Sequence, residues 1–353
     1  MEGARGIAVA LVFLVHYFAA FGVWTRGTAS EPIGQFLWTI GNSGVDLFFV
    51  LSGYLIYSAV VKPRVDYAHF LRRRLQRIYP TFLVVFAVYL ALSFVFPAES
   101  KLPASPGRAI AFVVENLLLL PGIFPITAIV TVAWSLSYEF FYYLALPLLA
   151  ATLRFAQWRP PRRLLFFVLL GIAFAASWFL FRPFAPRLLM FVAGIVVYEE
   201  VKRAKDRGSL HPVADWVIFA TTVATFPILA LVLTLPHGDL HRVIVSAIGF
   251  GLFVYACFRS RGPVARACSW APLRWLGNMS YSYYLIHALT INACRLVLLR
   301  VAGTSVSPAR YWLAMPLVFA ATLVTSTLLF ALVERPFSLV TRRQPAIDAI
   351  AVS

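Results

Sequence analysis

The sequence predicts an all-α protein: a polytopic transmembrane helical bundle of about ten transmembrane helices with one additional broken or re-entrant segment. Three observations predict this class. The 353-residue chain is 61% hydrophobic and 13% charged, whereas about a quarter of the residues of a soluble domain are charged. Its apolar residues form runs of about twenty, which is the length that a helix needs to cross the hydrocarbon core. Most of its Lys and Arg residues lie in alternate connections between those runs.

The apolar runs give the helices in chain order. Those of spanning length lie at 5–24, 38–61, 78–96, 134–153, 164–181, 187–201, 213–235, 242–258, 279–299 and 311–333. A further apolar segment, 109–132, contains Pro121 and Pro125, and proline interrupts a helix. It is either an additional crossing or a segment that enters and leaves on one side.

Charge decides between these alternatives. The basic connections are 62–77, 154–163, 202–211 and 259–274, together with Arg5 and the tail residues Arg335, Arg342 and Arg343. Cytoplasmic loops of membrane proteins carry the excess of Lys and Arg. The pattern obeys this rule only if 109–132 does not cross an odd number of times. We therefore expect a re-entrant or outer-surface segment there, with the N- and C-termini both cytoplasmic.

The net charge of +17 is mostly this topological signal, together with attraction to anionic membrane lipid. Because the basic residues are spread one loop at a time, they do not indicate a nucleic-acid partner. No long polar stretch separates a soluble domain, so 1–353 is expected to be one membrane-embedded domain. The spacing of Cys257, Cys268 and Cys294 indicates neither a disulfide framework nor a metal site.

Four ionisable side chains fall inside the predicted helices, and such groups mark functional sites because they are costly in a membrane. At about 1.5 Å per residue, His16 lies roughly 16 Å from the inner boundary, and Asp46 and His287 lie about 12 Å deep. Glu139 is nearer the outer face, about 7–8 Å in. A histidine beside a carboxylate is a usual general base. The competing interpretation is that these are buried polar residues hydrogen-bonded to neighbouring helices.

The third predicted helix is preceded by the densest basic cluster of the chain. Its arginines are Arg72, Arg73, Arg74 and Arg77. Residues three or four apart share a helix face, so this cluster suits an anionic ligand such as a phosphate. The alternative is an ordinary stop signal of snorkelling arginines.

Two further segments allow a structural or a functional interpretation. The small residues of 41–46 and 52–54, which include Ser52, let helices approach closely. Trp134 and Tyr138 suit an interfacial aromatic belt, although a belt does not explain Glu139 beside them.

These segments resemble acyltransferase family 3, whose integral membrane proteins O-acylate cell-surface glycans, lipid-linked saccharides and some small molecules. The matching stretches are 2–8 with the spacing Arg5-(ten residues)-His16, then 44–54, 70–80, 133–139, 276–287 and 334–337. No one stretch is specific, but six in order over nearly the whole chain are. Many members carry Leu at the position of Ala4, on a helix face that need not touch the chemistry.

The resemblance implies the activity and the roles of the residues. No tightly bound cofactor is expected; acetyl-CoA or another acyl-CoA is the donor substrate, held by Arg5, Arg72, Arg73, Arg74 and Arg77. His16 is the expected catalytic residue, as general base or as transient acyl carrier, with Asp46 orienting it and Glu139 contacting the acceptor.

The remaining site residues and partners follow from the same resemblance. Ser52, Trp134, Tyr138 and His287 are the expected substrate-binding residues. The acceptor is a carbohydrate or a lipid-linked saccharide. The location is the inner (plasma) membrane of a bacterium, and a homo-oligomer is compatible with the sequence.

Two other classes of protein compete with this hypothesis. A proton-coupled transporter or permease would use the same midplane His16, Asp46 and His287. Transporters often carry paired broken helices, whereas 109–132 has no counterpart in the second half. A structural membrane protein leaves the buried ionisable residues unexplained.

Overall fold

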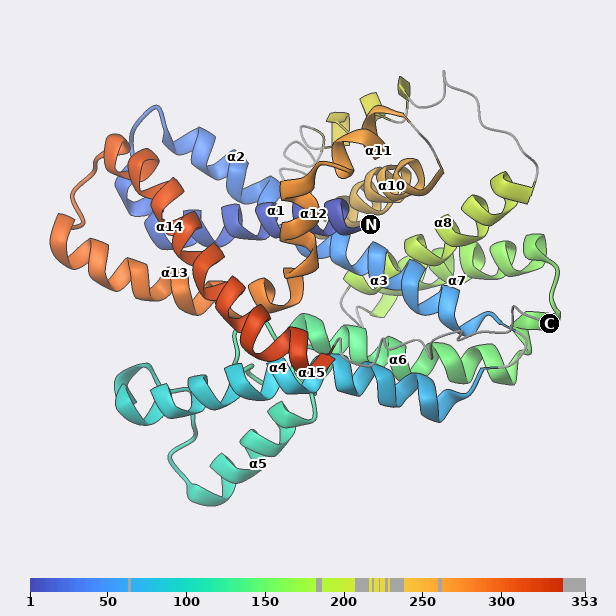
Figure 1. Cartoon of the computed structure of the whole chain (residues 1–353), viewed down its shortest axis with the longest axis horizontal. Coiled ribbons are helices and arrows are strands. Elements are labelled where there is room, and N and C mark those ends of the chain that lie inside the picture. Colours follow the sequence, from blue (N-terminus) through green and yellow to red (C-terminus); the bar gives the residue numbers. More distant parts are fainter. Residues whose placement is uncertain are drawn as a thin grey trace, which may run out of the picture.

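The structure is a computed structural model, and the residues it describes are 1–62, 65–181, 186–206, 216–217, 219–221, 223–225, 228, 238–259 and 262–338. Within these residues the regular elements are helices, with one isolated bridge between Pro121 and Phe124. Figure 1 shows them running mostly along the long axis of the molecule. The predicted all-α class is confirmed.

The element bounds follow the chain. The longer helices are α1 (Glu2–Phe21), α2 (Glu31–Gly41), α3 (Gly44–Val60), α4 (Tyr67–Val95), α5 (Pro106–Leu117), α6 (Trp134–Thr152), α7 (Pro160–Phe181), α8 (Leu189–Asp206), α10 (Gly238–Arg259), α13 (Ser280–Ala302) and α14 (Pro308–Leu329). The short ones are η1 (Gly22–Thr25), η2 (Pro97–Glu99), η3 (Phe155–Gln157), η4 (Pro186–Leu188), α11 (Pro263–Cys268), α12 (Ala271–Asn278), the π-helix η5 (Phe330–Glu334) and α15 (Arg335–Ser338).

Seven stretches of the described residues are long and apolar enough to cross a membrane, fewer than the predicted ten. They are Glu2–Thr25, Glu31–Val60, Tyr67–Val95, Pro160–Ser177, His241–Phe258, Ser280–Ala302 and Pro308–Phe337. Predicted helices at 134–153 and 187–201 exist as α6 and α8 but are not among the seven, and charged residues enter the last turns of α8. The predicted helix 213–235 lies largely outside the described residues.

The second predicted helix, 38–61, is wrong as a single element. The chain forms α2 from Glu31 and then α3, with a break at Asn42 and Ser43. At this break Gly41 and Gly44 pack on the backbone of α1, where a Cβ would lie 2.7–2.8 Å from backbone atoms. The break is caused by packing against the neighbouring helix α1. Hydropathy alone does not detect it, because the residues at the break are small.

The segment 109–132 contains one short helix and an ordered loop. α5 has 12 residues, so it is about 18 Å long and too short to cross about 30 Å of hydrocarbon. Asn116 holds the loop after it, because its amide accepts from Ile129 N at 2.8 Å and donates to Thr127 O at 3.2 Å. The chain therefore folds back here, as expected of a segment that does not cross.

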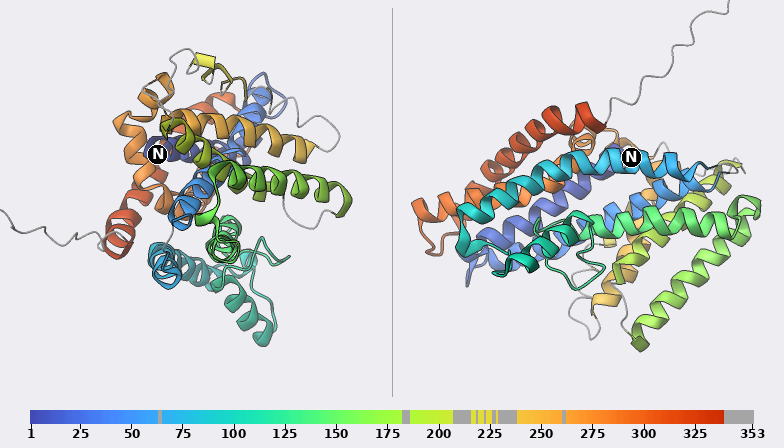
Figure 2. Two further views of the ribbon diagram at one scale, coloured as in Figure 1. Left: turned by 90° about the vertical axis from the view of Figure 1, so that its right-hand side faces the viewer. Right: turned by 90° about the horizontal axis from the view of Figure 1, so that it is seen from below.

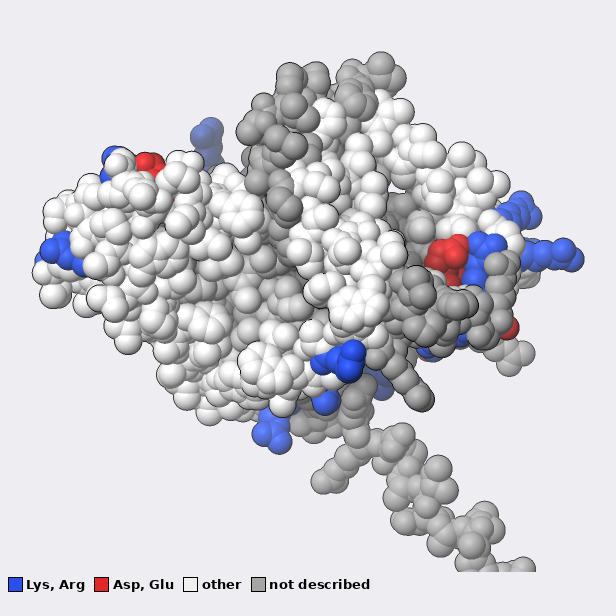
Figure 3. Space-filling view, turned by 90° about the horizontal axis from the view of Figure 1, so that it is seen from above, with Lys and Arg blue, Asp and Glu red and all other residues white. Residues whose placement is uncertain are grey.

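The long helices form two halves that overlap at the centre. In Figures 1 and 2, α1, α2, α13 and α14 lie in one half, α3, α6, α7 and α8 in the other, and α4 runs along most of one edge. Figure 3 shows a largely uncharged surface between charged side chains at the two ends and along one edge. This surface is what a membrane-embedded bundle presents.

The α3 and α8 contact brings two backbones together through glycines. A Cβ on Gly53 would lie 2.1 Å from the Phe191 carbonyl oxygen, and one on Gly194 would lie 2.0 Å from the Val50 carbonyl oxygen. The predicted close approach of helices at the small residues 52–54 is thus confirmed. It fixes α3, which carries two of the candidate site residues.

Candidate functional site

The N-terminus of α1 lies inside the bundle, and this places the candidate site. Gly277 of α12 faces the Glu2 backbone so closely that a Cβ there would lie 1.7 Å from the Glu2 oxygen. Arg5, three residues later, is half-buried and lines an internal cavity.

His16 on α1 and His287 on α13 form a histidine pair. Their ring centroids are 4.8 Å apart and their planes meet at 68°. His287 is fully buried, and its Nδ1 lies 3.0 Å from the Tyr283 carbonyl oxygen. A carbonyl oxygen only accepts, so this contact needs the proton on Nδ1 and leaves a lone pair on Nε2. Nε2 has no hydrogen-bond partner among the described residues.

A buried acceptor without a partner costs about 1–3 kcal/mol. The Nε2 atom of His287 is therefore ready to accept a hydrogen bond from the N–H of His16 or from an incoming hydroxyl. This is the chemistry expected of a site that handles a hydroxyl group and its proton.

Asp46 on α3 pairs with an arginine that the sequence analysis did not select. Arg187 Nε lies 3.4 Å from Asp46 Oδ1, and the carboxylate is fully buried. Arg187 also donates to the Asn42 side chain at 2.8 Å and stands over the Trp134 ring at 5.4 Å. The carboxylate expected to orient a histidine is thus engaged by a guanidinium.

Asp46 does not bond to His16 among the described residues, because neither of its carboxylate oxygens has a hydrogen-bond partner there. Gly44, two residues earlier, packs against α1 between Ala8 and Val12. The expected orientation of His16 by Asp46 stays a prediction.

Glu139 on α6 lines a small cavity of about 50 Å³, which we call the Glu139 cavity. The other lining residues are Arg5, Val45, Phe48, Phe49, Ser52, Ser135, Leu136, Ser280, Tyr281 and Tyr284. Ser52 Oγ donates to Glu139 Oε1 at 3.2 Å, and the Tyr143 hydroxyl donates to the same oxygen. Glu139 therefore faces the interior together with Arg5, and its expected depth near the outer side of the membrane stays a prediction.

The Glu139 cavity and the histidine pair share a residue. Tyr284 lines the cavity, and its ring centroid is 5.8 Å from that of His287. Its hydroxyl donates to the Val132 carbonyl at 3.2 Å and lies 2.7 Å from Ser135 Oγ, which donates to it. The two parts of the candidate site are thus neighbours.

The arginine cluster of α4 divides into two pairs. Arg72 and Arg73 are exposed, whereas Arg74 and Arg77 are partly buried. The Arg74 guanidinium lies 5.2 Å from the ring of Tyr143, which bonds Glu139. Arg77 is close enough to Arg5 for the two positive charges to repel each other. The structure therefore directs two of the four predicted arginines toward the Glu139 cavity.

Glu334 is a buried acid whose position the sequence analysis did not interpret. It ends the π-helix η5 and accepts from Ser282 N at 3.0 Å and from Ser282 Oγ at 2.5 Å, in the first turn of α13. It also interacts electrostatically with Arg5. A π-helical turn often marks a functional site, but no sequence pattern reveals it.

Trp134 and Tyr138 do not form a lipid-facing belt. Tyr138 is buried, and its ring lies 5.6 Å from that of Trp134 in an edge-to-face arrangement. Both rings also approach Phe49 of α3. These aromatic residues line the interior between the Asp46–Arg187 pair and the Glu139 cavity.

Known proteins resemble the chain over most of its length. A family model described as an acyltransferase domain matches residues 1–332. Acyltransferase MdmB of Streptomyces mycarofaciens is 29% identical, over 99% of this chain and 94% of its own. Exopolysaccharide production protein ExoZ of Rhizobium meliloti is 26% identical, over 87% of this chain and 92% of its own.

A third relative is longer. Peptidoglycan O-acetyltransferase OatA of Listeria monocytogenes is 26% identical over 95% of this chain, which spans 55% of the length of that protein. No solved structure matches the chain significantly.

Proposed function

The chain belongs to acyltransferase family 3 and is an acyl-transferring enzyme, and on this premise we propose the reaction. It moves an acyl group, most simply acetyl, from cytoplasmic acyl-CoA to a hydroxyl of a cell-surface or secreted carbohydrate. The similarity to peptidoglycan O-acetyltransferase OatA and exopolysaccharide production protein ExoZ supports the acetyl group and the polysaccharide acceptor. The observation that carries the proposal is the histidine pair, in which a buried, unpaired Nε2 of His287 meets His16.

In the proposed reaction His16 is the general base. It takes the proton of the acceptor hydroxyl as the oxygen forms a bond to the acyl carbon and the thioester C–S bond breaks. The proton then passes to the leaving thiolate of CoA. Alternatively His16 attacks first and carries the acyl group to the acceptor. In the first route the acceptor oxygen bonds to the acyl carbon directly, whereas in the second the bond between His16 and the acyl carbon forms first.

The arginines are proposed to hold the donor. Arg74, Arg77 and Arg5 form a path of positive charge from α4 to the Glu139 cavity. Guanidinium groups bind phosphates through paired hydrogen bonds, as the CoA phosphates require. Arg72 and Arg73 are exposed and would meet the donor first.

The acceptor is proposed to enter from the other side. Glu139 and Ser52 line the cavity, and Trp134 and Tyr138 offer aromatic faces next to it. Asp46 pairs with Arg187, which stands over the Trp134 ring, and so helps to position the aromatic face of Trp134.

We also propose the topology of about ten crossings, with both termini in the cytoplasm and the protein in a bacterial inner membrane. Reporter fusions test it. Fusions after residues 105 and 128 should both report the outside, because 109–132 then returns to the side from which it started. Opposite signals would restore an eleventh crossing.

The reaction is tested with purified protein in nanodiscs, radiolabelled acetyl-CoA and candidate glycan acceptors. His16→Ala should lose transfer by at least about 100-fold, the lower range for a general base. His69→Ala is the matched control, because His69 is exposed on the first turn of α4. Unchanged transfer in His16→Ala, at equal protein yield, would exclude the proposed role.

The competing hypothesis of a proton-coupled transporter makes the opposite prediction. It expects no label on any acceptor, and solute uptake into sealed vesicles driven by a proton gradient. Uptake that depends on His16 without label transfer would overturn the proposed function.

A further inference from the structure

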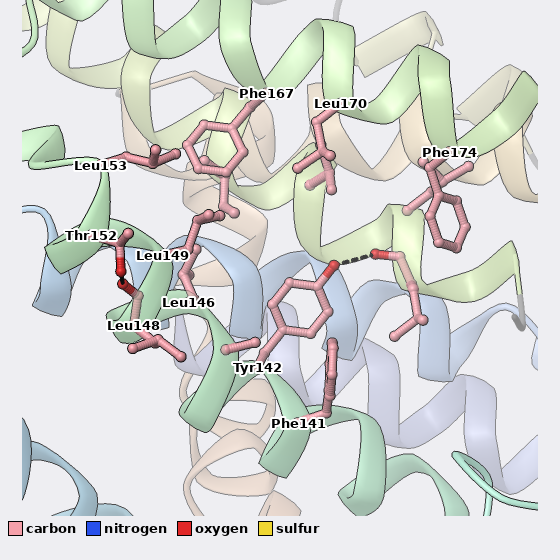
Figure 4. Close-up of a pocket in the computed structure, with 15 residues that line it drawn as sticks. Phe141, Tyr142, Leu146, Leu148, Leu149, Thr152, Leu153, Phe167, Leu170 and Phe174 are labelled. Carbon is pink, nitrogen blue, oxygen red and sulfur yellow. Dashed lines mark hydrogen bonds between the residues drawn. The ribbon is translucent and has the colours of Figure 1, made fainter. Parts of the chain in front are cut away.

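An open apolar groove lies between α6, α7 and α8, away from the candidate site. Its volume is about 530 Å³, and its walls include Phe141, Leu148 and Leu149 of α6 and Phe167 and Leu170 of α7 (Figure 4). Because aliphatic and aromatic side chains form nearly the whole lining, its natural content is hydrocarbon.

The two polar side chains that line the groove are already satisfied. The Tyr142 hydroxyl donates to the Leu188 carbonyl at 2.9 Å, and Thr152 Oγ1 donates to the Leu148 carbonyl at 2.8 Å (Figure 4). Neither offers a free hydrogen bond to a ligand. A sugar or a nucleotide would lose its hydrogen bonds to water in this groove and gain none.

The length of the groove matches one leaflet. It extends along α6 from Phe141 to Leu153, which is about 18 Å at 1.5 Å per residue. Half of the hydrocarbon core is about 15 Å. A single lipid chain that enters from one side would therefore fill it.

The end of the groove at Leu153 opens on the basic connection between α6 and α7. Arg154, Arg159 and Arg162 are exposed there, and the Arg162 guanidinium lies 4.1 Å from the ring of Trp158. The sequence from 154 to 163 contains no Asp or Glu. Arginines beside a tryptophan are typical of the headgroup level of a membrane.

The fourth arginine of this connection is committed elsewhere. Arg163 is buried and pairs with Glu199 of α8, with Nε 2.5 Å from Oε1, and also donates to the Trp158 carbonyl at 2.7 Å. This ion pair anchors the backbone of the connection at the end of the groove.

We propose that the groove and the connection together bind one anionic phospholipid. Its acyl chain lies in the groove, and its phosphate contacts Arg154, Arg159 and Arg162. The one-leaflet length favours a lipid chain, and charge complementarity favours an anionic headgroup over a neutral one. The leaflet is the cytoplasmic one in the orientation proposed above, and the lipid site does not depend on the acyl-transfer chemistry.

The test is native mass spectrometry of the detergent-purified protein, titrated with phosphatidylglycerol and with phosphatidylcholine of the same chains. Wild type should bind the anionic lipid at least about tenfold more tightly. The triple variant Arg154→Gln, Arg159→Gln, Arg162→Gln should lose this preference, because each arginine contributes about fivefold. Arg300→Gln, at an exposed arginine at the end of α13, should keep it.

A second pair of variants tests the groove. Ala145→Trp fills it and should lower binding of both lipids, whereas Leu144→Trp, on an exposed neighbour outside the lining, should not. Phosphatidylglycerol with a photoactivatable chain should label peptides of α6 and α7 in wild type, a readout that needs no variant.

Four outcomes of the lipid measurements would overturn the proposal. They are equal affinity of wild type for the two lipids, an unchanged preference in the triple variant, label outside α6 to α8, and competition by inorganic phosphate alone at the same concentration as the lipid. A dimer that Ala145→Trp abolishes would assign the groove to a second copy instead.

Discussion

His16 and His287 meet edge to face with their ring centroids 4.8 Å apart, and no hydrogen bond joins them. His287 is held by the Tyr283 carbonyl and by a stacked contact with the Tyr283 ring at 5.3 Å. His16 is half-buried and less constrained. The His287 ring is therefore held in place, and the His16 ring can be oriented against it.

This relationship predicts different effects for two His287 variants. His287→Leu should lower kcat by about 10–100-fold, because it removes the acceptor that Nε2 provides in a buried place. His287→Gln should retain most of the activity, because the amide oxygen reaches a similar position. Initial rates with radiolabelled acetyl-CoA would measure both, with KM for the donor unchanged. Equal losses in the two variants would indicate a role in packing alone.

Glu139 is predicted to act through its charge. Glu139→Gln keeps the shape but weakens the hydrogen bonds from Ser52 and Tyr143, so kcat/KM for the acceptor should fall by about 10–100-fold. Tyr143→Phe should reproduce part of this loss. Glu99→Gln, at an exposed acid, should leave kcat/KM unchanged; a loss there of similar size would argue against a specific site.

Substitutions of the four α4 arginines are predicted to raise KM for acetyl-CoA by different factors, according to how buried each arginine is. Arg74→Gln and Arg77→Gln should raise KM for acetyl-CoA strongly, about tenfold or more, because partly buried charges are little screened. Arg72→Gln and Arg73→Gln should have smaller effects that vanish at high salt. KM measured at low and high ionic strength would show the difference. Identical salt dependence for all four would contradict it.

Asp46 and Arg187 are predicted to be coupled. Removing one partner leaves a buried charge, which typically costs about 3–5 kcal/mol. Asp46→Asn and Arg187→Gln should each lower the Tm, and the double variant should lose less than the sum, with a coupling of about 1–3 kcal/mol. The partly exposed pair Arg203–Glu200 serves as control and should show little coupling.

The glycine contact of α3 and α8 is predicted to limit side-chain size. Gly53→Leu should reduce the yield of monodisperse protein and its Tm, since even a Cβ would meet the Phe191 carbonyl. Gly171→Ala in α7 should be neutral or slightly stabilising, because there the Cβ makes an ordinary 3.5 Å contact. Size-exclusion profiles after heating would compare the two. A stable Gly53→Leu protein would show that α3 and α8 can separate.

The sequence predicted the helices well where hydropathy alone defines them, as in α13 and α14. The predicted start of α4 at 78 was wrong, because the arginine-rich stretch from Tyr67 is also helical and hydropathy does not detect it. The prediction also failed at the break between α2 and α3, because the cause is the backbone of α1. Among site residues, His16 and His287 do meet, as equal depth in two helices allows. The Asp46–Arg187 pair was missed because partners on different helices leave no pattern in a single sequence.

The π-helical turn at Phe330–Glu334 determines where this segment tolerates the loss of a residue. Its i→i+5 hydrogen bonds enclose one residue more than the i→i+4 bonds of an α-helix. Deleting one residue there, such as the exposed Leu332, would therefore leave a regular α-helical turn and keep the residues after it facing nearly the same way. A deletion in a regular part of α14 would instead rotate everything after it by about 100° and turn Glu334 away from Ser282.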